Sequence, residues 1–199
     1  MGLLTIIKKQ KIKDKEIRCL VLGLDNSGKS TIVNNILPAS ERNESITPTV
    51  GFQIHSVQIH SKQDSQDYTV SMWDVGGQRT LRPFWDNYFD KTDVLVWCID
   101  ISSPIRFDES FRELKELVTQ DKDRIGYQCK LIVALNKCDL IQPSPKFIEE
   151  LTHDIQSQIE SMLSQGTGQS NIATYVLCSG ITGTGIDMLC RQIVTKKTV

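Results

Sequence analysis

The chain has 199 residues, of which 39% are hydrophobic and 24% charged, and its formal net charge is -1. This length and composition suit one globular domain with a sizeable core, and the lack of any run of about 18 apolar residues excludes a membrane-spanning helix. The balanced net charge also argues against a general nucleic-acid-binding protein, which is usually basic along a whole face.

Residues 1–16 are the first predicted element, an amphipathic helix that precedes one domain over residues 17–199. Four apolar side chains between Leu3 and Ile7 share one side of a helical wheel, and lysines follow them. Such a segment can dock into a partner's groove, pack on its own domain or lie on a membrane. We favour docking to a partner, because four apolar side chains without a fatty chain give at most weak membrane contact through Gly2–Lys13.

The extreme N-terminus does not decide whether the chain carries a lipid. Gly2 follows Met1, as N-myristoylation requires, but Ile6 stands where the motif has Ser or Thr. The apolar stretch Gly2–Ile7 is also too short for the core of a secretory signal peptide.

Apolar runs alternate with helical patterns along the rest of the chain. The near-continuous apolar runs at 93–100 and 129–139 are typical of parallel strands buried on both faces, whereas 52–60 alternates as a half-exposed strand does before a polar hairpin loop at 61–67. This order predicts an α/β sheet covered by helices on both faces. The predicted strands are 17–23, 52–60, 68–74, 93–100, 129–139 and 173–179, and the predicted helices are 29–37, 105–121, 146–164 and 185–195.

Residues 23–30 match the pattern G-x-x-x-x-G-K-[ST] between a predicted strand and a predicted helix, the context that a phosphate-binding loop requires. Gly23 and Gly28 permit a backbone approach that a Cβ would prevent, so main-chain N–H groups can surround phosphate oxygens. Lys29 places a charge on the β- and γ-phosphates, and Ser30 offers a hydroxyl to Mg²⁺. The loop residues predicted to contact nucleotide are Gly23, Asp25, Asn26, Ser27, Gly28, Lys29 and Ser30.

A second polar segment, WDVGGQ, ends the strand predicted at 68–74. Asp74 at a strand's carboxyl end can hold Mg²⁺ directly or through a water. Gly77 has a backbone N–H that can reach a γ-phosphate, and Gln78 can orient an attacking water. Taken alone, this segment is also compatible with an ordinary turn.

The segment Asn136-Lys137-Cys138-Asp139 follows another buried strand. The carboxylate of Asp139 can accept the N1–H and N2–H donors of guanine, a pair that adenine lacks, so that ATP would be rejected. Asn136 can support the N7/O6 edge, and the stem of Lys137 can cover the base plane.

The last predicted strand ends in a segment that adds weak support for a base site. Ser179 can steady Asp139, and the N–H of Gly180 can meet guanine O6. The four polar segments occur in one order, each at a strand's carboxyl end, where α/β sheets bind ligands.

Together these residues resemble the small GTPases, and the sequences of their motifs are similar to those of the ADP-ribosylation-factor family. The similar segments are WDVGGQ at 73–78, GLDNSGKST at 23–31, TPTVGF at 47–52 and LRPFWDNYF at 81–89. The resemblance implies a P-loop NTPase fold with a six-stranded, mostly parallel sheet, one antiparallel edge strand and five main helices. It also implies that Thr31 contacts nucleotide, that Thr49 closes on Mg²⁺ and γ-phosphate, and that 52–73 slides in register when GTP replaces GDP.

We therefore expect a switch that binds GTP or GDP with Mg²⁺ and hydrolyses GTP. The expected catalytic residues are Gln78, Lys29 and Gly77, and the expected metal ligands are Ser30, Thr49 and Asp74. We expect slow hydrolysis that needs an activating protein, because the sequence does not place Arg79 or Arg82 at the phosphates and because Asp25 adds negative charge. Alternatives are a switch that hardly hydrolyses, a nucleotide kinase or ATPase, and a scaffold with a vestigial site.

The resemblance also implies partners and a location. It predicts activating and exchange proteins, a tubulin-folding cofactor as effector, and a role in microtubule function, with membrane traffic or release of lipidated cargo as the alternative. Six cysteines without zinc spacing, several of them in apolar runs, indicate a reducing compartment. We expect a cytoplasmic monomer, in part on microtubules, with partner surfaces altered by the longer segments 61–67 and 143–172.

Overall fold

A computed structural model of the chain describes residues 15–89, 91–120, 129–141, 145–167 and 173–195. The helix predicted over residues 1–16 therefore lies outside the described residues apart from its last two positions. Glu16 already belongs to the first strand, one residue before the predicted start of the domain. In the described part of the chain, no helix combines the length and the hydropathy needed to cross a bilayer.

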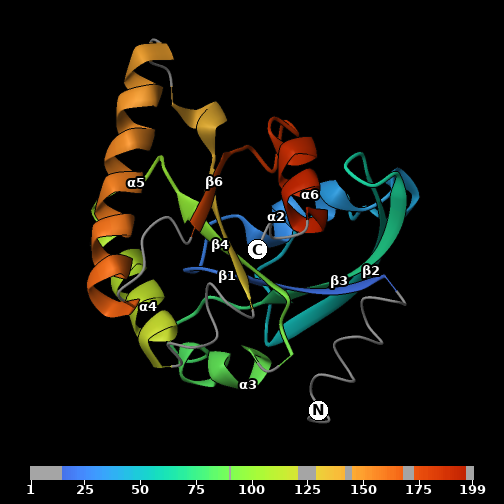
Figure 1. Ribbon diagram of the computed structural model, residues 1–199, viewed down its shortest axis with the longest axis horizontal. Helices are drawn as coiled ribbons and strands as arrows, with labels where there is room; N and C mark the ends of the chain where they lie inside the picture. The colour runs from blue at the N-terminus through green and yellow to red at the C-terminus, as the bar shows by residue number, and fades with distance from the viewer. Residues whose placement is uncertain (1–14, 90, 121–128, 142–144, 168–172, 196–199) are drawn as a thin grey trace.

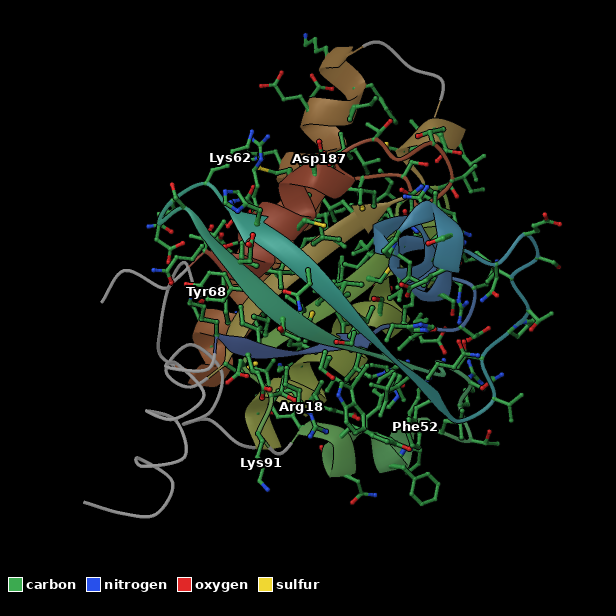
Figure 2. The ribbon with its side chains drawn as sticks, turned by 90° about the vertical axis from the view of Figure 1, so that its right-hand side faces the viewer. Arg18, Phe52, Lys62, Tyr68, Lys91 and Asp187 are labelled. Carbon is green, nitrogen blue, oxygen red and sulfur yellow. The ribbon has the colours of Figure 1, made fainter. Side chains whose placement is uncertain are left out.

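Six strands form one sheet in the order β2-β3-β1-β4-β5-β6. The edge strand β2 runs antiparallel to β3, and every other neighbouring pair is parallel. Figure 2 shows the β2–β3 hairpin crossing the front of the molecule between Phe52 and the turn that carries Lys62. The predicted fold class is confirmed. The strands are β1 Glu16–Leu22, β2 Phe52–Ser61, β3 Gln66–Val75, β4 Val94–Asp100, β5 Lys130–Asn136 and β6 Ala173–Leu177.

Helices cover both faces of the sheet (Figure 1). Two of them, α2 (Lys29–Ile36) and α6 (Ile186–Val194), pack on one face, and α3 (Trp85–Phe89), α4 (Phe107–Gln120) and α5 (Pro145–Thr167) lie on the other. Successive side chains of a strand point to opposite faces, and β5 accordingly sends Ile132 to the first core and Leu131 to the second. This burial on both faces is why the central strands read as continuous apolar runs.

Four of the differences between the elements and the sequence prediction have a clear location and bounds. The hairpin loop is shorter than 61–67, because the strand pairing extends to Ser61 and Gln66. Strand β5 ends at Asn136 rather than 139, because Lys137 has a φ of 67° that a strand does not accept. Residues 82–89, for which no element was predicted, form a 3₁₀ turn followed by α3. The helix predicted to start at 105 starts at Phe107, after a 3₁₀ turn.

Candidate functional site

The loop between β1 and α2 requires its two glycines. Gly23 has a φ of 140° and Gly28 a φ of 90°, conformations that residues with a Cβ rarely adopt. A Cβ at Gly23 would collide with the carbonyl oxygen of Cys98, and one at Gly28 with Nδ2 of Asn136. Asn26 also has a positive φ, of 60°. The loop therefore curls tightly at the N-terminus of α2, where main-chain N–H groups and the helix dipole favour an anion.

Asn136 ties this loop to the ends of the two strands that would contact a base. Its Nδ2 donates to the Ser27 carbonyl oxygen at 2.8 Å, and its Oδ1 accepts from the Gly180 N–H at 2.9 Å. Asn136 is buried at the carboxyl end of β5. The Cys98 thiol also donates to the Ser27 carbonyl oxygen, at 3.1 Å, and burial raises the pKa of this thiol to about 11, so it stays protonated as a donor.

We predict that Asn136→Ala will strongly destabilise the nucleotide-free protein. The change removes both hydrogen bonds and leaves the Gly180 N–H buried without its partner. Because each orphaned buried group costs about 1–3 kcal/mol, the free energy of unfolding in urea should fall by about 2–4 kcal/mol. Asn34→Ala is the matched control, since Asn34 bonds the exposed Asn43 on the surface of α2. Equal unfolding curves for the two variants would contradict the prediction.

Lys29 lies under the loop rather than in solvent. Its Nζ donates to the carbonyl oxygens of Gly23 at 3.0 Å and Leu24 at 2.8 Å, and the residue is 5% exposed. Burial lowers the pKa of its ammonium group from the ordinary value. Since an ammonium group has three donors, one remains to meet an anion held by the loop.

Three oxygen-bearing side chains, which the sequence analysis named as candidate metal ligands, meet beside the loop. Ser30 Oγ lies 2.8 Å from Thr49 Oγ1, which donates to Asp74 Oδ2 at 3.1 Å. Asp74 is 1% exposed, and its Oδ1 has no hydrogen-bond partner among the described residues. A buried carboxylate oxygen without a partner is costly. One carboxylate with two hydroxyls is a hard oxygen set of the kind Mg²⁺ prefers, so these residues fit that ion.

The segment Gly76–Gln78 is packed against the loop. The carbonyl oxygen of Gly77 accepts from the Asp25 N–H at 3.2 Å, and a Cβ on Gly77 would collide with backbone atoms of residues 23–25. Trp85 Nε1 donates to the Gly76 carbonyl oxygen at 3.1 Å, and Gln78 is partly buried. A cavity of about 410 Å³ is lined in part by Asp25, Asn26, Gly28, Lys29, Ser30, Thr31, Thr49, Gly77 and Gln78.

The residues predicted to hold a base follow β5 and β6. Asp139 is exposed in a 3₁₀ turn and so open to a ligand. Lys137 Nζ is held 2.7 Å from Asp100 Oδ2, a contact that the sequence analysis missed although Asp100 also ends a buried strand. Ser179 Oγ accepts from the Thr182 N–H at 3.1 Å. In this arrangement the Ser179 side chain stabilises the loop after β6, to which Ser179 itself belongs.

Asp25 was expected to add negative charge to the site, but arginines compensate that charge. Arg106 Nη2 lies 2.9 Å from Asp25 Oδ1, and Arg82 Nη2 lies 3.3 Å from the same oxygen. Hydrogen bonding from Arg106 lowers the pKa of the Asp25 carboxyl. Arg106 was missed from the sequence, because 81 residues separate it from Asp25.

Known proteins resemble this chain in sequence and in fold. The family model described as "ADP-ribosylation factor family" matches residues 3–196. The chain is 41% identical over 200 aligned positions to ADP-ribosylation factor-like protein 2 of Arabidopsis thaliana, covering 98% of this chain and 97% of that protein. It is 39% identical over 140 positions to ADP-ribosylation factor-like protein alp41 of Schizosaccharomyces pombe, covering 70% and 69%. The small GTPase Arl6 of Trypanosoma brucei, solved with the nucleotide analogue GppNp, shares the fold with a TM-score of 0.68, 21% identity and coverage of 92% and 99%.

Proposed function

The chain belongs to the ADP-ribosylation factor family of small GTPases, which are GTP-binding switches, and on that premise we propose that it hydrolyses GTP slowly and depends on an activating protein. The observation that carries the proposal is the meeting of Ser30, Thr49 and Asp74 beside the phosphate loop. These side chains come from three separate segments. A ligand that Thr49 and Asp74 hold together therefore contacts both of their segments.

The phosphates are held by the loop and by Lys29. Main-chain N–H groups at the N-terminus of α2 would surround the β-phosphate, and the third donor of Lys29 would reach the β- and γ-oxygens. Ser30, Thr49 and Asp74 would hold Mg²⁺, which when bound neutralises charge on the phosphate oxygens. The relative Arl6 was solved with a triphosphate analogue, which is consistent with this assignment.

Hydrolysis transfers the γ-phosphoryl group to water. Gln78 orients the water, whose oxygen bonds to the γ-phosphorus while the bond to the β–γ bridging oxygen breaks. The products are GDP and inorganic phosphate, and the protons of the water pass to phosphate. The N–H of Gly77 holds a γ-oxygen during this step. We expect slow turnover because Arg82 and Arg106, the arginines described near the loop, are engaged by carboxylates.

The base is selected by Asp139. Its exposed carboxylate offers two acceptors to guanine N1–H and N2–H, while the stem of Lys137, fixed by Asp100, covers the ring. Ser179 and Gly180 follow β6, whose Cys178 carbonyl oxygen accepts from the Cys138 N–H at 3.2 Å, and the Gly180 N–H donates to Asn136 Oδ1 at 2.9 Å.

We expect GTP and GDP to bind at least a thousandfold more tightly than ATP, since adenine leaves the carboxylate of Asp139 without its donors. Competition against a fluorescent GDP analogue measures this ratio. Single-turnover hydrolysis on the purified protein measures the rate, and values at or above about one per second, typical of efficient enzymes, contradict slow hydrolysis. ATP affinity equal to that of GTP would instead favour a kinase or ATPase.

We infer that the effector is a tubulin-folding cofactor and that the protein acts in the cytoplasm on microtubule function. The support is the similarity to ADP-ribosylation factor-like protein 2 over nearly the whole chain, together with the resemblance of the motifs. A purified cofactor that binds the GTP-loaded form at least tenfold more tightly than the GDP-loaded form supports this role. Equal binding of both forms, with nucleotide-dependent release of a lipidated peptide from a carrier, supports the alternative.

A further inference from the structure

A cluster of three arginines and three carboxylates joins the phosphate loop to the Gly76–Gln78 segment and to α4. The two signs balance within the cluster, and the side chain of Arg82 at its centre is only 6% exposed. A cavity of about 650 Å³ between α3 and α4 lies over it. The members of this arginine–carboxylate cluster are Arg79, Arg82, Arg106, Asp25, Glu109 and Glu113.

Each nitrogen of the Arg82 guanidinium has a partner on a different element. Nε donates to the Gly77 carbonyl oxygen at 3.1 Å. Nη1 donates to Glu109 at 3.0 Å and Glu113 at 2.8 Å, and Nη2 lies 3.3 Å from Asp25. The planar, rigid fork of arginine makes such a set of contacts directional as well as attractive.

This arrangement fixes the backbone directly before Gln78. The Gly77 carbonyl oxygen is held from one side by Arg82 and from the other by the Asp25 N–H at 3.2 Å. Glu109 and Glu113 lie one turn apart on α4 and provide a helical anchor for the guanidinium. Gly77 has no free space toward the loop. If the Arg82 contact is lost, Gly77 can therefore move mainly away from the loop.

The pKa values of Asp25, Arg82 and Glu109 in the cluster are shifted in the directions that keep these groups charged. Hydrogen bonding from Arg82 lowers the pKa of Glu109, and Arg106 lowers that of Asp25. Burial acts to lower the pKa of Arg82, but hydrogen bonds to Glu113 and Glu109 outweigh it and the pKa is raised.

We propose that Arg82 is a positioning residue for GTP hydrolysis, which acts through the Gly77 carbonyl to place Gln78 against the phosphate loop. The proposal rests on the GTPase function proposed above. It differs from a role for arginine at the phosphates, because the Arg82 guanidinium is directed to carboxylates and to a main-chain oxygen.

The test compares Arg82→Met with Arg79→Met in the full chain. Arg79 donates to Glu109 from a side chain that is 82% exposed, so its removal takes an arginine from the same cluster without touching Gly77. For each variant, the measurements are single-turnover GTP hydrolysis, the dissociation constants of GTP and GDP, and the melting temperature of the GDP-loaded protein.

We expect Arg82→Met to slow hydrolysis by about 10- to 100-fold, since a displacement of about 1 Å costs up to about 100-fold. Nucleotide affinity should change by less than about threefold. Arg79→Met should keep the wild-type rate within about twofold.

Hydrolysis by Arg82→Met within twofold of wild type overturns the inference, as does a loss of rate that only parallels a loss of GTP affinity. If Arg82→Met fails to fold, Glu113→Gln carries the test, because it weakens the contact of Arg82 with α4 without altering the Gly76–Gln78 segment. That variant should hydrolyse about three- to tenfold more slowly at unchanged affinity, and an unchanged rate contradicts the proposal. A wild-type protein that binds GTP without hydrolysing it overturns the proposed GTPase function and this inference together. Normal wild-type hydrolysis with an unaffected Arg82→Met overturns the inference alone.

Discussion

Replacing Asp139 by Asn should exchange the base preference of the protein from guanine to xanthine. A carboxylate offers two acceptors to the N1–H and N2–H donors of guanine, whereas an amide offers one acceptor and one donor. The amide donor would face the N2 donor of guanine, and two donors that face each other without an acceptor lose a hydrogen bond. Xanthine carries a carbonyl at that position, which accepts the hydrogen bond. We therefore expect GTP affinity to fall on the order of 10⁴-fold, with xanthosine triphosphate binding more tightly than GTP.

Competition of each triphosphate against a fluorescent GDP analogue gives the two affinities. The substitution should leave folding intact, because Asp139 is exposed in its 3₁₀ turn and the Asn136 contacts that hold the loops are unchanged. Asp187→Asn is the matched control, since Asp187 is exposed in the first turn of α6 (Figure 2) and is not among the residues proposed to contact nucleotide. An Asp139→Asn protein that still prefers GTP would remove the basis for guanine selection by this carboxylate.

The second large effect is expected for Gln78→Leu, which should slow single-turnover hydrolysis by about 100-fold or more. Leucine is of comparable size to glutamine but cannot hydrogen-bond a water, so the attacking water loses its orientation. Nucleotide affinity should stay within about threefold, because in the proposed mechanism the loop, Lys29 and the metal ligands hold the phosphates.

Gln66→Leu, at the exposed far end of β3, is the matched control and should hydrolyse GTP at the wild-type rate. The measurement is the rate of phosphate release after rapid mixing of GTP-loaded protein with Mg²⁺, with and without an activating protein. If Gln78→Leu turned over GTP as fast as wild type in both conditions, the chain would be a switch whose hydrolysis does not use this glutamine.

Several features of the fold could be predicted because their signals are local. Hydrophobic patterning located the six strands, and the strand–glycine-loop–helix pattern of residues 17–37 predicted the turn that Gly23 and Gly28 make possible. Boundaries were less predictable where a backbone conformation decides them. The end of β5 depends on the left-handed conformation of Lys137, which could not be predicted from the residue type. The short helix α3 escaped prediction because its five residues hold too few turns for a helical period.

The amino-acid sequence by itself determined the kind of ligand to expect, because the residues proposed to hold phosphate and base lie in short segments whose spacing and side-chain chemistry can be read directly. Only the tertiary structure decided how those segments are fixed together. Asn136 meets Ser27 across 109 positions, and Arg82 meets Asp25 across 57. Such pairings depend on which strands become neighbours and on the helix that covers them. They therefore cannot be predicted from the spacing of side chains along the chain.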